Sequence, residues 1–586
     1  MKRIFDLLPH IKRNYNEVDT VLAGKEDGKW VKYNIDQYIT ITNSISFGLL
    51  KLGIQKGDKI ATISNNRPEW NFLDIAIQQV GAIHVPIYPT ISDSDYRYIL
   101  NHAEVKYGFV AGKELLKRIE HIIPEIKSLQ GIYTFKHIDN VPHLNELIEL
   151  GNKNQQKEKL ERAKGSVSED DISTMIYTSG TTGFPKGVML SHKNILSNVE
   201  GLQPVSPTLA GDKVISYLPL CHIYERTLNL MFQSMGCTVY YAENLARIVD
   251  NMQEIKPHAM ATVPRLLEKI YDRIIMKGRK LTGIKKVLFF WAVNLGLKYE
   301  FYGKNGSFYE LQLKLARKLV FNKWKIVMGG EFKVIVSGGA ALQPRLMRIF
   351  NAAGIPLVSG YGLSEHSPVV STTTLADGEQ RIGSVGLALK NVNIKIGDDG
   401  EILVKSSSVM KGYYKSPEQT NEVISKDGWL HTGDIGMLED DKFLKITGRK
   451  KEIFKTSNGK YISPVLLENK LKESPFIDSL VVLGENQKFA AALITPNFDH
   501  LKSWCKIKNI PYTNNQEMVL NKSIIMRFKK EVDHYNKTFG ATEKINRFKL
   551  LNNEWTIKSG ELTPNLKLRR DFIMKKYKEE VFGLFS

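Results

Sequence analysis

Residues 172–187 read ISTMIYTSGTTGFPKG, an apolar stretch that runs directly into a loop of glycine, serine, threonine and lysine. Main-chain N–H and hydroxyl groups in such a loop can converge on an anion, because glycine tolerates the φ values that the loop requires. Lys186 adds a positive point charge. The loop is not a Walker A motif, because Lys186 stands three residues after Gly183 and is followed by Gly187 rather than by Ser or Thr. The segment predicts a strand that leads into a phosphate-binding loop, although its composition alone also fits a flexible loop.

Outward from this segment, strand-like and helix-like stretches alternate. Residues 59–66 predict a buried strand, 67–82 an amphipathic helix and 83–90 the next strand. Residues 332–339 and 354–362 predict two further strands that each run into glycine. This alternation is typical of a parallel α/β sheet. The polar stretch 151–168 predicts an exposed connector.

The pattern changes after about residue 380. Residues 392–406 predict a hairpin around Asp398, Asp399 and Gly400, and 442–449 predict a strand that ends in a Gly-Arg turn. A smaller region of mixed helix and strand follows. Because 586 residues exceed one compact core, we expect a large domain over 1–449 and a small domain over 450–586.

The composition excludes several classes of protein. Apolar residues make up 42% and charged residues 25%, which is ordinary for a globular chain and not for a disordered or collagen-like one. The three cysteines have no CxxC spacing, so neither a zinc motif nor a disulfide framework is expected. The net charge of +20 favours anionic partners. The apolar run at 287–293 is too short to span a membrane, and it predicts either a buried helix or contact with a membrane surface.

The motifs taken together resemble the adenylate-forming, AMP-binding enzymes. YTSGTTGFPKG at 177–187 is followed by YGLSE at 361–365, HTGD at 431–434, Gly448-Arg449 and the late Lys567. Within that superfamily, the segments at 218–226, 263–271 and 562–570 resemble the long-chain fatty acyl-CoA synthetases. The resemblance implies a large N-terminal α/β domain of mixed and parallel sheets flanked by helices, with a β-barrel-like subdomain. A smaller, mobile α+β lid domain is expected to follow it.

The resemblance implies a site for ATP and AMP. Its residues are Thr178, Ser179, Gly180, Thr181, Thr182, Gly183, Lys186, Gly338, Gly339, Ala340, Tyr361, Gly362, Ser364, Glu365, Asp434, Arg449 and Lys567. Tyr361 is expected to offer its ring to adenine, with Gly338 and its neighbours allowing a ring to approach the main chain. Asp434 is expected to accept hydrogen bonds from both ribose hydroxyls, and Arg449 to donate to ribose or phosphate. Taken alone, the same residues also fit ordinary turns and surface charges.

Mg²⁺ is the cofactor that the resemblance implies, with ATP and coenzyme A as co-substrates. Glu365 and the hydroxyl of Thr178 are expected to complete the metal site, since Mg²⁺ takes one or two carboxylates together with phosphate oxygens and waters. Thr178, Glu365 and Lys567 are the expected catalytic residues. Cations and oriented donors are needed because two anions must meet at the α-phosphorus.

The small domain carries the remaining expected roles. By resemblance, Lys567 bridges the carboxylate and the α-phosphate in the first half-reaction, although Leu566 stands where the wider family has glycine. Lys451 falls at the hinge, about which the small domain rotates between half-reactions. The rotation brings the loop Thr456-Ser457-Asn458-Gly459-Lys460 to the coenzyme A tunnel. From the sequence alone, Lys451 and Lys567 also fit solvated surface charges.

An apolar pocket is needed for the acyl chain. By resemblance His222 lines it, and we expect Val263, Pro264 and the segment 287–297 near its walls. Cys221 lies next to His222, but catalysis by this pair is not expected, because adjacent residues of a strand point to opposite faces. Coenzyme A brings its own thiol.

The leading interpretation is an ATP-dependent long-chain fatty acid:coenzyme A ligase. Transfer of the acyl group to an acyl carrier protein and a non-catalytic basic protein bound to a membrane or nucleic acid are the alternatives. The leading interpretation has fatty acid, ATP and coenzyme A as partners, and no nucleic acid. The first residues lack the apolar core of a signal peptide, which favours a cytoplasmic location. Peripheral contact with the inner face of the membrane and a homodimer stay open.

Overall fold

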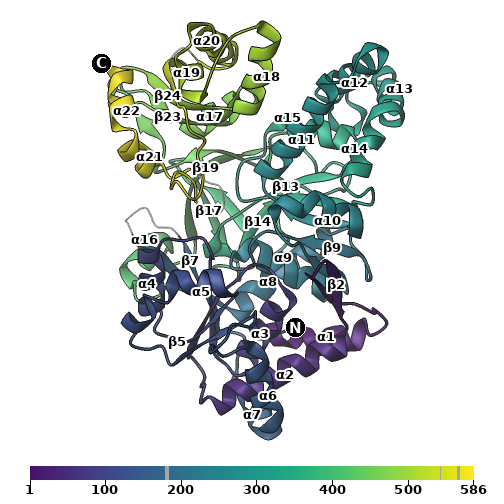
Figure 1. The fold of residues 1–586 in the computed structure, drawn as a ribbon, viewed down its shortest axis with the longest axis vertical. Coiled ribbons are helices and arrows are strands. Elements are labelled where there is room, and N and C mark those ends of the chain that lie inside the picture. The colour runs from purple at the N-terminus through teal and green to yellow at the C-terminus, as the bar shows by residue number, and fades with distance from the viewer. Residues whose placement is uncertain (179–183, 541–542, 564–567) are drawn as a thin grey trace.

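The computed structural model describes residues 1–178, 184–540, 543–563 and 568–586. The N-terminal part, purple to blue, forms the lower body, and the last residues, green to yellow, form a separate upper lobe (Figure 1). A helical arm made by residues 283–327 projects on the other side of the upper end (Figure 1).

The first sheet contains the strand that leads into the predicted phosphate loop. In spatial order its strands are β18 (Gly412–Tyr413), β8 (Lys186–Ser191), β7 (Ile172–Thr178), β4 (Ile83–Ile87), β3 (Lys59–Ile63), β5 (Val105–Val110) and β6 (Gly131–Thr134). The strands from β7 to β6 run parallel, whereas β7, β8 and β18 pair antiparallel. The predicted strand–helix–strand unit at 59–90 is confirmed here.

The second sheet carries the other glycine-ended strands. In order these are β15 (Leu387–Ala388), β14 (Val369–Thr372), β13 (Leu357–Gly362), β12 (Val334–Ser337), β11 (Ala259–Thr262), β9 (Lys213–Ser216), β10 (Thr238–Tyr241), β1 (Leu22–Glu26) and β2 (Lys29–Tyr33). The strands from β13 to β1 are parallel, and antiparallel strands flank them at both edges.

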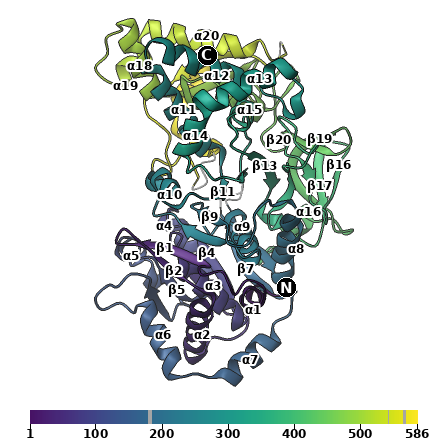
Figure 2. The same cartoon turned by 90° about the vertical axis from the view of Figure 1, so that its right-hand side faces the viewer.

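An antiparallel sheet follows, on the right of Figure 2. Its strands are β16 (Asn393–Ile396), β17 (Glu401–Lys405), β19 (Leu430–Glu439) and β20 (Phe443–Arg449). The β16–β17 pair confirms the predicted hairpin, and β20 confirms the predicted strand. Main-chain hydrogen bonds of Leu444 with residues 385 and 386 join this sheet to the second sheet.

The upper lobe has its own sheets and its own core. Its strands are β21 (Phe454–Lys455), β22 (Tyr461–Ile462), β23 (Ile477–Leu483), β24 (Ala490–Pro496) and β25 (Ile545–Leu550). Phe498, Leu501 and Phe528 are among its buried side chains, in clusters that contain no residue from the lower body. We call residues 452–586 the small lobe.

Helices cover the sheets. Those of the lower body and arm are α1 (Leu7–Asn14), α2 (Ile35–Lys51), α3 (Pro68–Gln79), α4 (Asp93–His102), α5 (Lys113–Ile119), α6 (Leu144–Lys153), α7 (Lys157–Ser166), α8 (His192–Leu202), α9 (Ile223–Ser234), α10 (Ile248–Ile255), α11 (Pro264–Arg279), α12 (Gly283–Gly296), α13 (Ser307–Ala316), α14 (Asn322–Val327), α15 (Pro344–Ala352) and α16 (Pro417–Val423). Those of the small lobe are α17 (Pro464–Leu471), α18 (Phe498–Lys508), α19 (Asn515–Leu520), α20 (Lys522–Asn536), α21 (Arg570–Lys576) and α22 (Lys578–Phe585).

Local sequence sets several helix starts. Pro264 occupies the first turn of α11, where its missing N–H costs no hydrogen bond. The side chain of Ser191 accepts a hydrogen bond from the Asn194 N–H at the start of α8. His222 does the same for the Tyr224 N–H at the start of α9. In the part of the chain that the structure describes, no helix has the length and apolarity needed to cross a bilayer.

The prediction of a connector without regular structure at 151–168 is wrong. Most of it is helix α7, and α6 extends to Lys153. The sequence KEKLERAK consists of good helix formers, and its single leucine, Leu160, is buried against the body. The polar composition of residues 157–166 therefore belongs to an exposed helix and not to a loop.

Candidate active site

The ends of three neighbouring parallel strands build one edge of the site. β11, β12 and β13 run side by side, so the residues that follow them meet at the same edge. Val263 and Pro264 follow β11, Gly338 and Gly339 follow β12, and Tyr361 lies at the end of β13. The proposed acyl-pocket and nucleotide residues are therefore neighbours.

A hydrogen-bonded chain joins the residues predicted to bind the nucleoside. The Tyr361 hydroxyl donates to Asp434 Oδ2 at 2.7 Å, and Arg449 Nε donates to Asp434 Oδ1 at 2.8 Å. Asp434 on β19 faces Arg449 on β20 directly. The carboxylate raises the pKa of the Arg449 guanidinium, and burial raises the pKa of the Tyr361 phenol well above its usual value. Tyr361 is thus fixed as a donor, with its ring largely buried.

A second chain joins the phosphate loop to the proposed metal carboxylate. The Tyr413 hydroxyl donates to Glu365 Oε1 at 2.8 Å, and Lys186 Nζ lies 4.8 Å from the centre of the Tyr413 ring. Glu365 lies on the short helix η7 (Ser364–His366), four residues after Tyr361. Thr178, at the end of β7, pairs with Lys186. Three sheets therefore contribute: the first supplies the loop-bearing strand, the second supplies Tyr361 with Glu365 four residues beyond it, and the antiparallel sheet supplies Asp434.

At Gly338 and Gly362 a neighbouring group lies so close to the main chain that a Cβ atom would not fit. A Cβ on Gly338 would lie 2.9 Å from Cζ of Tyr224, so the Tyr224 ring packs against the main chain at this position. A Cβ on Gly362 would lie 2.2 Å from the Pro368 carbonyl oxygen. Gly339 has φ +77°, which leads the chain from β12 past Ala340 to α15. Ser364 opens helix η7.

Val263, Pro264 and His222 lie beside this edge, whereas the segment 287–297, also expected near the pocket walls, belongs to α12 in the helical arm. The Tyr217 hydroxyl is 2.7 Å from Thr262 Oγ1, which connects the segment after β9 to the end of β11. His222 caps helix α9, so Cys221 and His222 do not form the strand that was predicted. The outcome for catalysis is the same, because burial raises the pKa of the Cys221 thiol and keeps it protonated.

The predicted hinge, Lys451, lies where the chain passes from the large N-terminal part into the small lobe. Lys450 Nζ contacts Asp399 at 2.7 Å and Glu401 at 3.0 Å, both in the β16–β17 hairpin of the antiparallel sheet in the large N-terminal part. One residue beyond Lys451, Glu452 pairs with Arg570 of the small lobe at 3.2 Å. Lys451 is therefore flanked by one residue held by each lobe.

Arg570 ties the two ends of the small lobe together. Its guanidinium binds both carboxylate oxygens of Glu468, at 2.8 and 2.6 Å, in addition to Glu452. Leu562 and Leu568 form an antiparallel bridge nearby in sequence. These contacts fix the chain on either side of residues 564–567. The predicted catalytic Lys567 lies outside the described residues, as do Ser179, Gly180, Thr181, Thr182 and Gly183 of the phosphate loop.

The predicted coenzyme A loop is the turn between β21 and β22. The Thr456 N–H donates to the Lys460 carbonyl at 2.9 Å, and Gly459 has φ +78°. The Ser457 N–H donates to the Gln487 carbonyl at 2.9 Å, and Asn458 Nδ2 lies 3.5 Å from the Lys488 carbonyl. The loop is an ordered turn supported by the β23–β24 connection.

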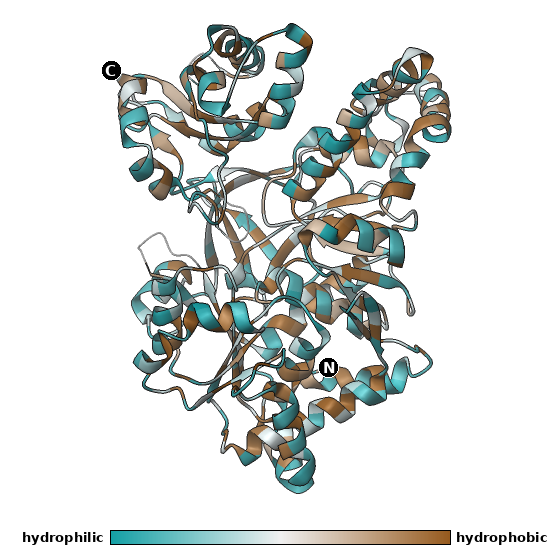
Figure 3. Ribbon diagram, viewed as in Figure 1, coloured by the Kyte–Doolittle hydropathy of each residue, from teal (hydrophilic) through white to brown (hydrophobic). Residues whose placement is uncertain are grey.

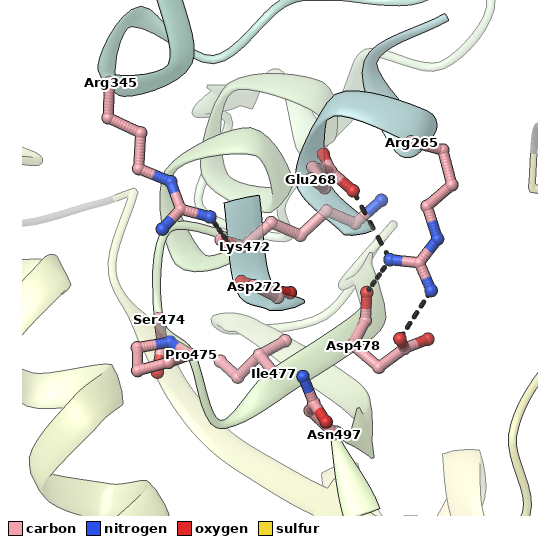
Figure 4. Close-up of a pocket in the computed structure, with 10 residues that line it drawn as sticks. All are labelled: Arg265, Glu268, Asp272, Arg345, Lys472, Ser474, Pro475, Ile477, Asp478 and Asn497. Carbon is pink, nitrogen blue, oxygen red and sulfur yellow. Dashed lines mark hydrogen bonds and ion pairs between the residues drawn. The ribbon is translucent and has the colours of Figure 1, made fainter. Parts of the chain in front are cut away.

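A small polar pocket marks the contact between the lobes. Figure 4 shows Arg265 of α11 reaching Asp478 of β23, while Arg345 of α15 donates to the Lys472 carbonyl at 3.2 Å. Asp272 lines the same pocket, where burial raises the pKa of its carboxyl to about 6. Motif analysis missed this contact, because the ion pair joins residues 213 positions apart.

Tyr413 was also missed. It lies in the segment KGYYKSPEQT, whose Gly, Ser and Pro suggest only a turn. The available signal was the pair of tyrosines in an otherwise polar stretch. Two aromatic side chains in a stretch whose other residues are polar indicate that another part of the protein packs over the rings.

Comparison with known families decides the classification. The AMP-binding enzyme family matches residues 14–414, and the AMP-binding enzyme C-terminal domain matches residues 451–586. The chain belongs to the AMP-binding enzymes. The chain is 31% identical to a long-chain-fatty-acid–CoA ligase of Mycobacterium bovis over 573 residues, which cover 96% of this chain and 93% of that protein. It is 30% identical to the peroxisomal long chain acyl-CoA synthetase 6 of Arabidopsis thaliana, over 99% of this chain and 85% of that one.

Two solved structures share the fold. The adenylation domain of a carboxylate reductase from Mycobacterium chelonae superposes with a TM-score of 0.77 at 20% identity, over 100% of this chain and 91% of that one. An anthranilate CoA ligase in complex with anthranoyl-AMP superposes with a TM-score of 0.73 at 19% identity, over 99% and 98%. The predicted fold is confirmed.

Proposed function

We propose that this AMP-binding enzyme is an ATP-dependent long-chain fatty acid–coenzyme A ligase. Fatty acid and ATP give acyl-AMP and pyrophosphate, and coenzyme A then gives acyl-CoA and AMP. The observation that carries the proposal is the continuous set of contacts from Lys186 through Tyr413 to Glu365, with Tyr361 and Asp434 beyond it. The names and near-complete coverage of the relatives support the choice of acid and of acceptor.

In the first half-reaction the fatty acid carboxylate attacks the α-phosphorus and the bond to the pyrophosphate oxygen breaks. Asp434 accepts hydrogen bonds from the ribose hydroxyls, which orients the α-phosphate. Lys186 and the loop residues Ser179, Gly180, Thr181, Thr182 and Gly183 hold the β- and γ-phosphates. Lys567 supplies an ammonium group between the carboxylate and the α-phosphate, where negative charge develops.

The residues present fit a magnesium ion. Glu365 Oε1 takes the Tyr413 hydrogen bond, and no contact among the described residues uses Oε2. One carboxylate oxygen, the Thr178 hydroxyl and phosphate oxygens match the hard oxygen set that Mg²⁺ prefers. When bound, the ion neutralises charge on the triphosphate and on the departing pyrophosphate.

In the second half-reaction the coenzyme A thiolate attacks the acyl carbonyl and AMP departs. We assign the rotation between the two states to Lys451, because its two neighbours in the chain are held by different lobes. The rotation withdraws Lys567 from the α-phosphate and brings the loop of Ser457, Asn458, Gly459 and Lys460 to the coenzyme A tunnel. No nucleophile of the protein is required.

The acyl chain lies against His222, Val263 and Pro264, beside the strand ends. Each buried methylene of a saturated chain contributes about 0.8 kcal/mol. We therefore expect kcat/KM to rise steeply with chain length until the pocket is filled.

The deciding experiment measures pyrophosphate release with ATP, Mg²⁺ and fatty acids of increasing length, and then supplies either coenzyme A or acyl carrier protein. Release that depends on a long-chain acid, followed by loading of coenzyme A, is the expected result. Loading of the carrier protein alone would identify the alternative acceptor. Absence of release with every acid would remove the ligase proposal in favour of a non-catalytic basic protein.

We further propose that the helical arm, residues 283–327, rests on an anionic membrane surface. Large apolar side chains are exposed on it: Ile284, Val287, Phe308, Leu311, Leu315, Leu319 and Ile326. Phe308, Leu311, Leu315 and Leu319 follow a helical spacing and form one stripe. The arm holds nine Lys and Arg residues but two Glu residues, and hydrophobic and hydrophilic residues alternate along its ribbon (Figure 3). Apolar stripes beside cations suit the interface of an anionic bilayer.

Sedimentation with phosphatidylglycerol vesicles tests the arm. Phe308→Ser with Leu311→Ser is expected to abolish binding, whereas Ile507→Ser, which changes an equally exposed apolar residue on α18, leaves it intact. Vesicle binding that survives the double substitution contradicts the assignment. Concentration-dependent dimerisation that only the arm variant loses would instead assign the arm to a homodimer.

A further inference from the structure

One tyrosine separates the two charges at the phosphate end of the site. Tyr413 donates its hydroxyl hydrogen to Glu365 and presents its ring to the Lys186 ammonium group. Among the described residues, no ion pair joins Lys186 to Glu365. Both the carboxylate and the ammonium group therefore contact the same side chain, the first at its tip and the second at its face.

Tyr413 is held rigidly in this position. It is 7% exposed, and its strand β18 pairs with β8, the strand that begins at Lys186. The Tyr413 N–H donates to Thr420 Oγ1 at 2.9 Å, and the next residue, Tyr414, donates its N–H to the Gly187 carbonyl at 2.8 Å. The Met410 N–H donates to the Glu365 carbonyl at 2.8 Å. One short strand thus fixes the distance between the phosphate loop and η7.

The two charges would attract each other if the ring were absent. Opposite charges in a partly buried site interact more strongly than in water, and an ion pair would then have to be broken before phosphate oxygens and a cation could bind. The ring occupies that space. Its electron-rich face stabilises the ammonium group. Its hydroxyl donates a hydrogen bond to one oxygen of the carboxylate, so the other oxygen stays available to a cation.

We infer that Tyr413 is a positioning residue for the Mg²⁺–ATP complex, which keeps Glu365 and Lys186 apart and oriented for separate parts of it. The inference rests on the proposed function. Tyr413 touches no reacting atom. It orients the Glu365 carboxylate toward the position of the cation, and it orients the Lys186 ammonium group toward the position of the terminal phosphates.

Calorimetric titration with a non-hydrolysable ATP analogue, at a series of Mg²⁺ concentrations, tests the inference without turnover. Tyr413→Phe keeps the ring and loses the hydroxyl, so the Mg²⁺ concentration for half-saturation rises about tenfold while affinity without Mg²⁺ is unchanged. Tyr413→Leu loses both contacts, and affinity without Mg²⁺ also falls. Tyr414→Phe, one residue along, is the matched control and behaves as the unmodified protein.

A double substitution tests the separation of charges itself. If Lys186 collapses onto Glu365 in Tyr413→Leu, adding Glu365→Gln restores the lost affinity for the analogue in the absence of Mg²⁺. Failure of this rescue, or wild-type Mg²⁺ dependence in Tyr413→Phe, overturns the inference and leaves the proposed function standing. A wild-type protein that does not bind the analogue at any Mg²⁺ concentration overturns both. Equal melting temperatures of wild type and Tyr413→Phe show that the comparison is made on folded protein.

Discussion

Asp434→Asn tests the contact with ribose. Asp434 is 4% exposed and accepts from Tyr361 and Arg449 at 2.7 and 2.8 Å, so asparagine fits the same space and keeps an acceptor for Arg449. What it loses is the negative charge. Hydrogen bonds to a charged acceptor are worth about 1 kcal/mol more than neutral ones, so two ribose hydroxyls together lose about 2 kcal/mol.

That loss corresponds to about a 30-fold weaker apparent affinity for ATP. We expect it in KM for ATP, measured by pyrophosphate release, with little change in KM for the fatty acid. The second arm of the assay uses 2′-deoxy-ATP and 3′-deoxy-ATP. Wild type discriminates against both analogues, whereas Asp434→Asn discriminates less, because the charge-assisted part of each hydrogen bond is already absent.

Asp440→Asn is the control, since this exposed carboxylate lies in the turn after β19 and pairs with Arg381. It should match wild type in both assays. Undiminished discrimination against both deoxy analogues in Asp434→Asn would refute the ribose assignment, whatever the change in KM for ATP.

Three further outcomes are expected. Lys567→Ala abolishes acyl-adenylate formation and leaves thioester formation from supplied acyl-AMP largely intact, and equal loss of both half-reactions in a folded variant contradicts the assignment. Burial raises the pKa of Glu225 to about 8 from 4.5. The folded protein then keeps a proton that the unfolded chain releases, so the free energy of unfolding falls by about 1.4 kcal/mol per pH unit between these values. Glu225→Gln removes this loss, and its melting temperature exceeds that of wild type by a margin that grows from about pH 6 to pH 8, whereas the exposed Glu200→Gln shows none. Asp478→Asn breaks the ion pair with Arg265 and increases hydrogen–deuterium exchange in the first turn of α11, and unchanged exchange there contradicts a role for the pair in holding the lobes together.

Sequence reasoning succeeded where a local pattern has one structural meaning. Apolar strands that end in glycine placed Gly338 and Tyr361 at strand ends, and the segment at 392–406 was predicted to fold back around Asp398, Asp399 and Gly400, as it does. Charge composition failed at 157–166, because strong helix propensity and one buried leucine outweighed polarity.

Contacts between distant segments could not be obtained from one chain. Tyr413 reaches Glu365 because β18 pairs with β8, and nothing in the segment around residue 413 specifies that pairing. Arg265 and Asp478 meet only through the relative orientation of the lobes. His222 was expected within a strand and instead caps a helix, since a single histidine carries no periodic signal.

Arg570 has a consequence for the energetics of rotation. By joining Glu452 to Glu468, it couples the first residues of the small lobe to the segment that borders Lys567. In the proposed mechanism, torsion at Lys451 and withdrawal of Lys567 are then one motion rather than two. A single equilibrium would then set the populations of both states, so a change that raises the population competent for one half-reaction lowers the population competent for the other.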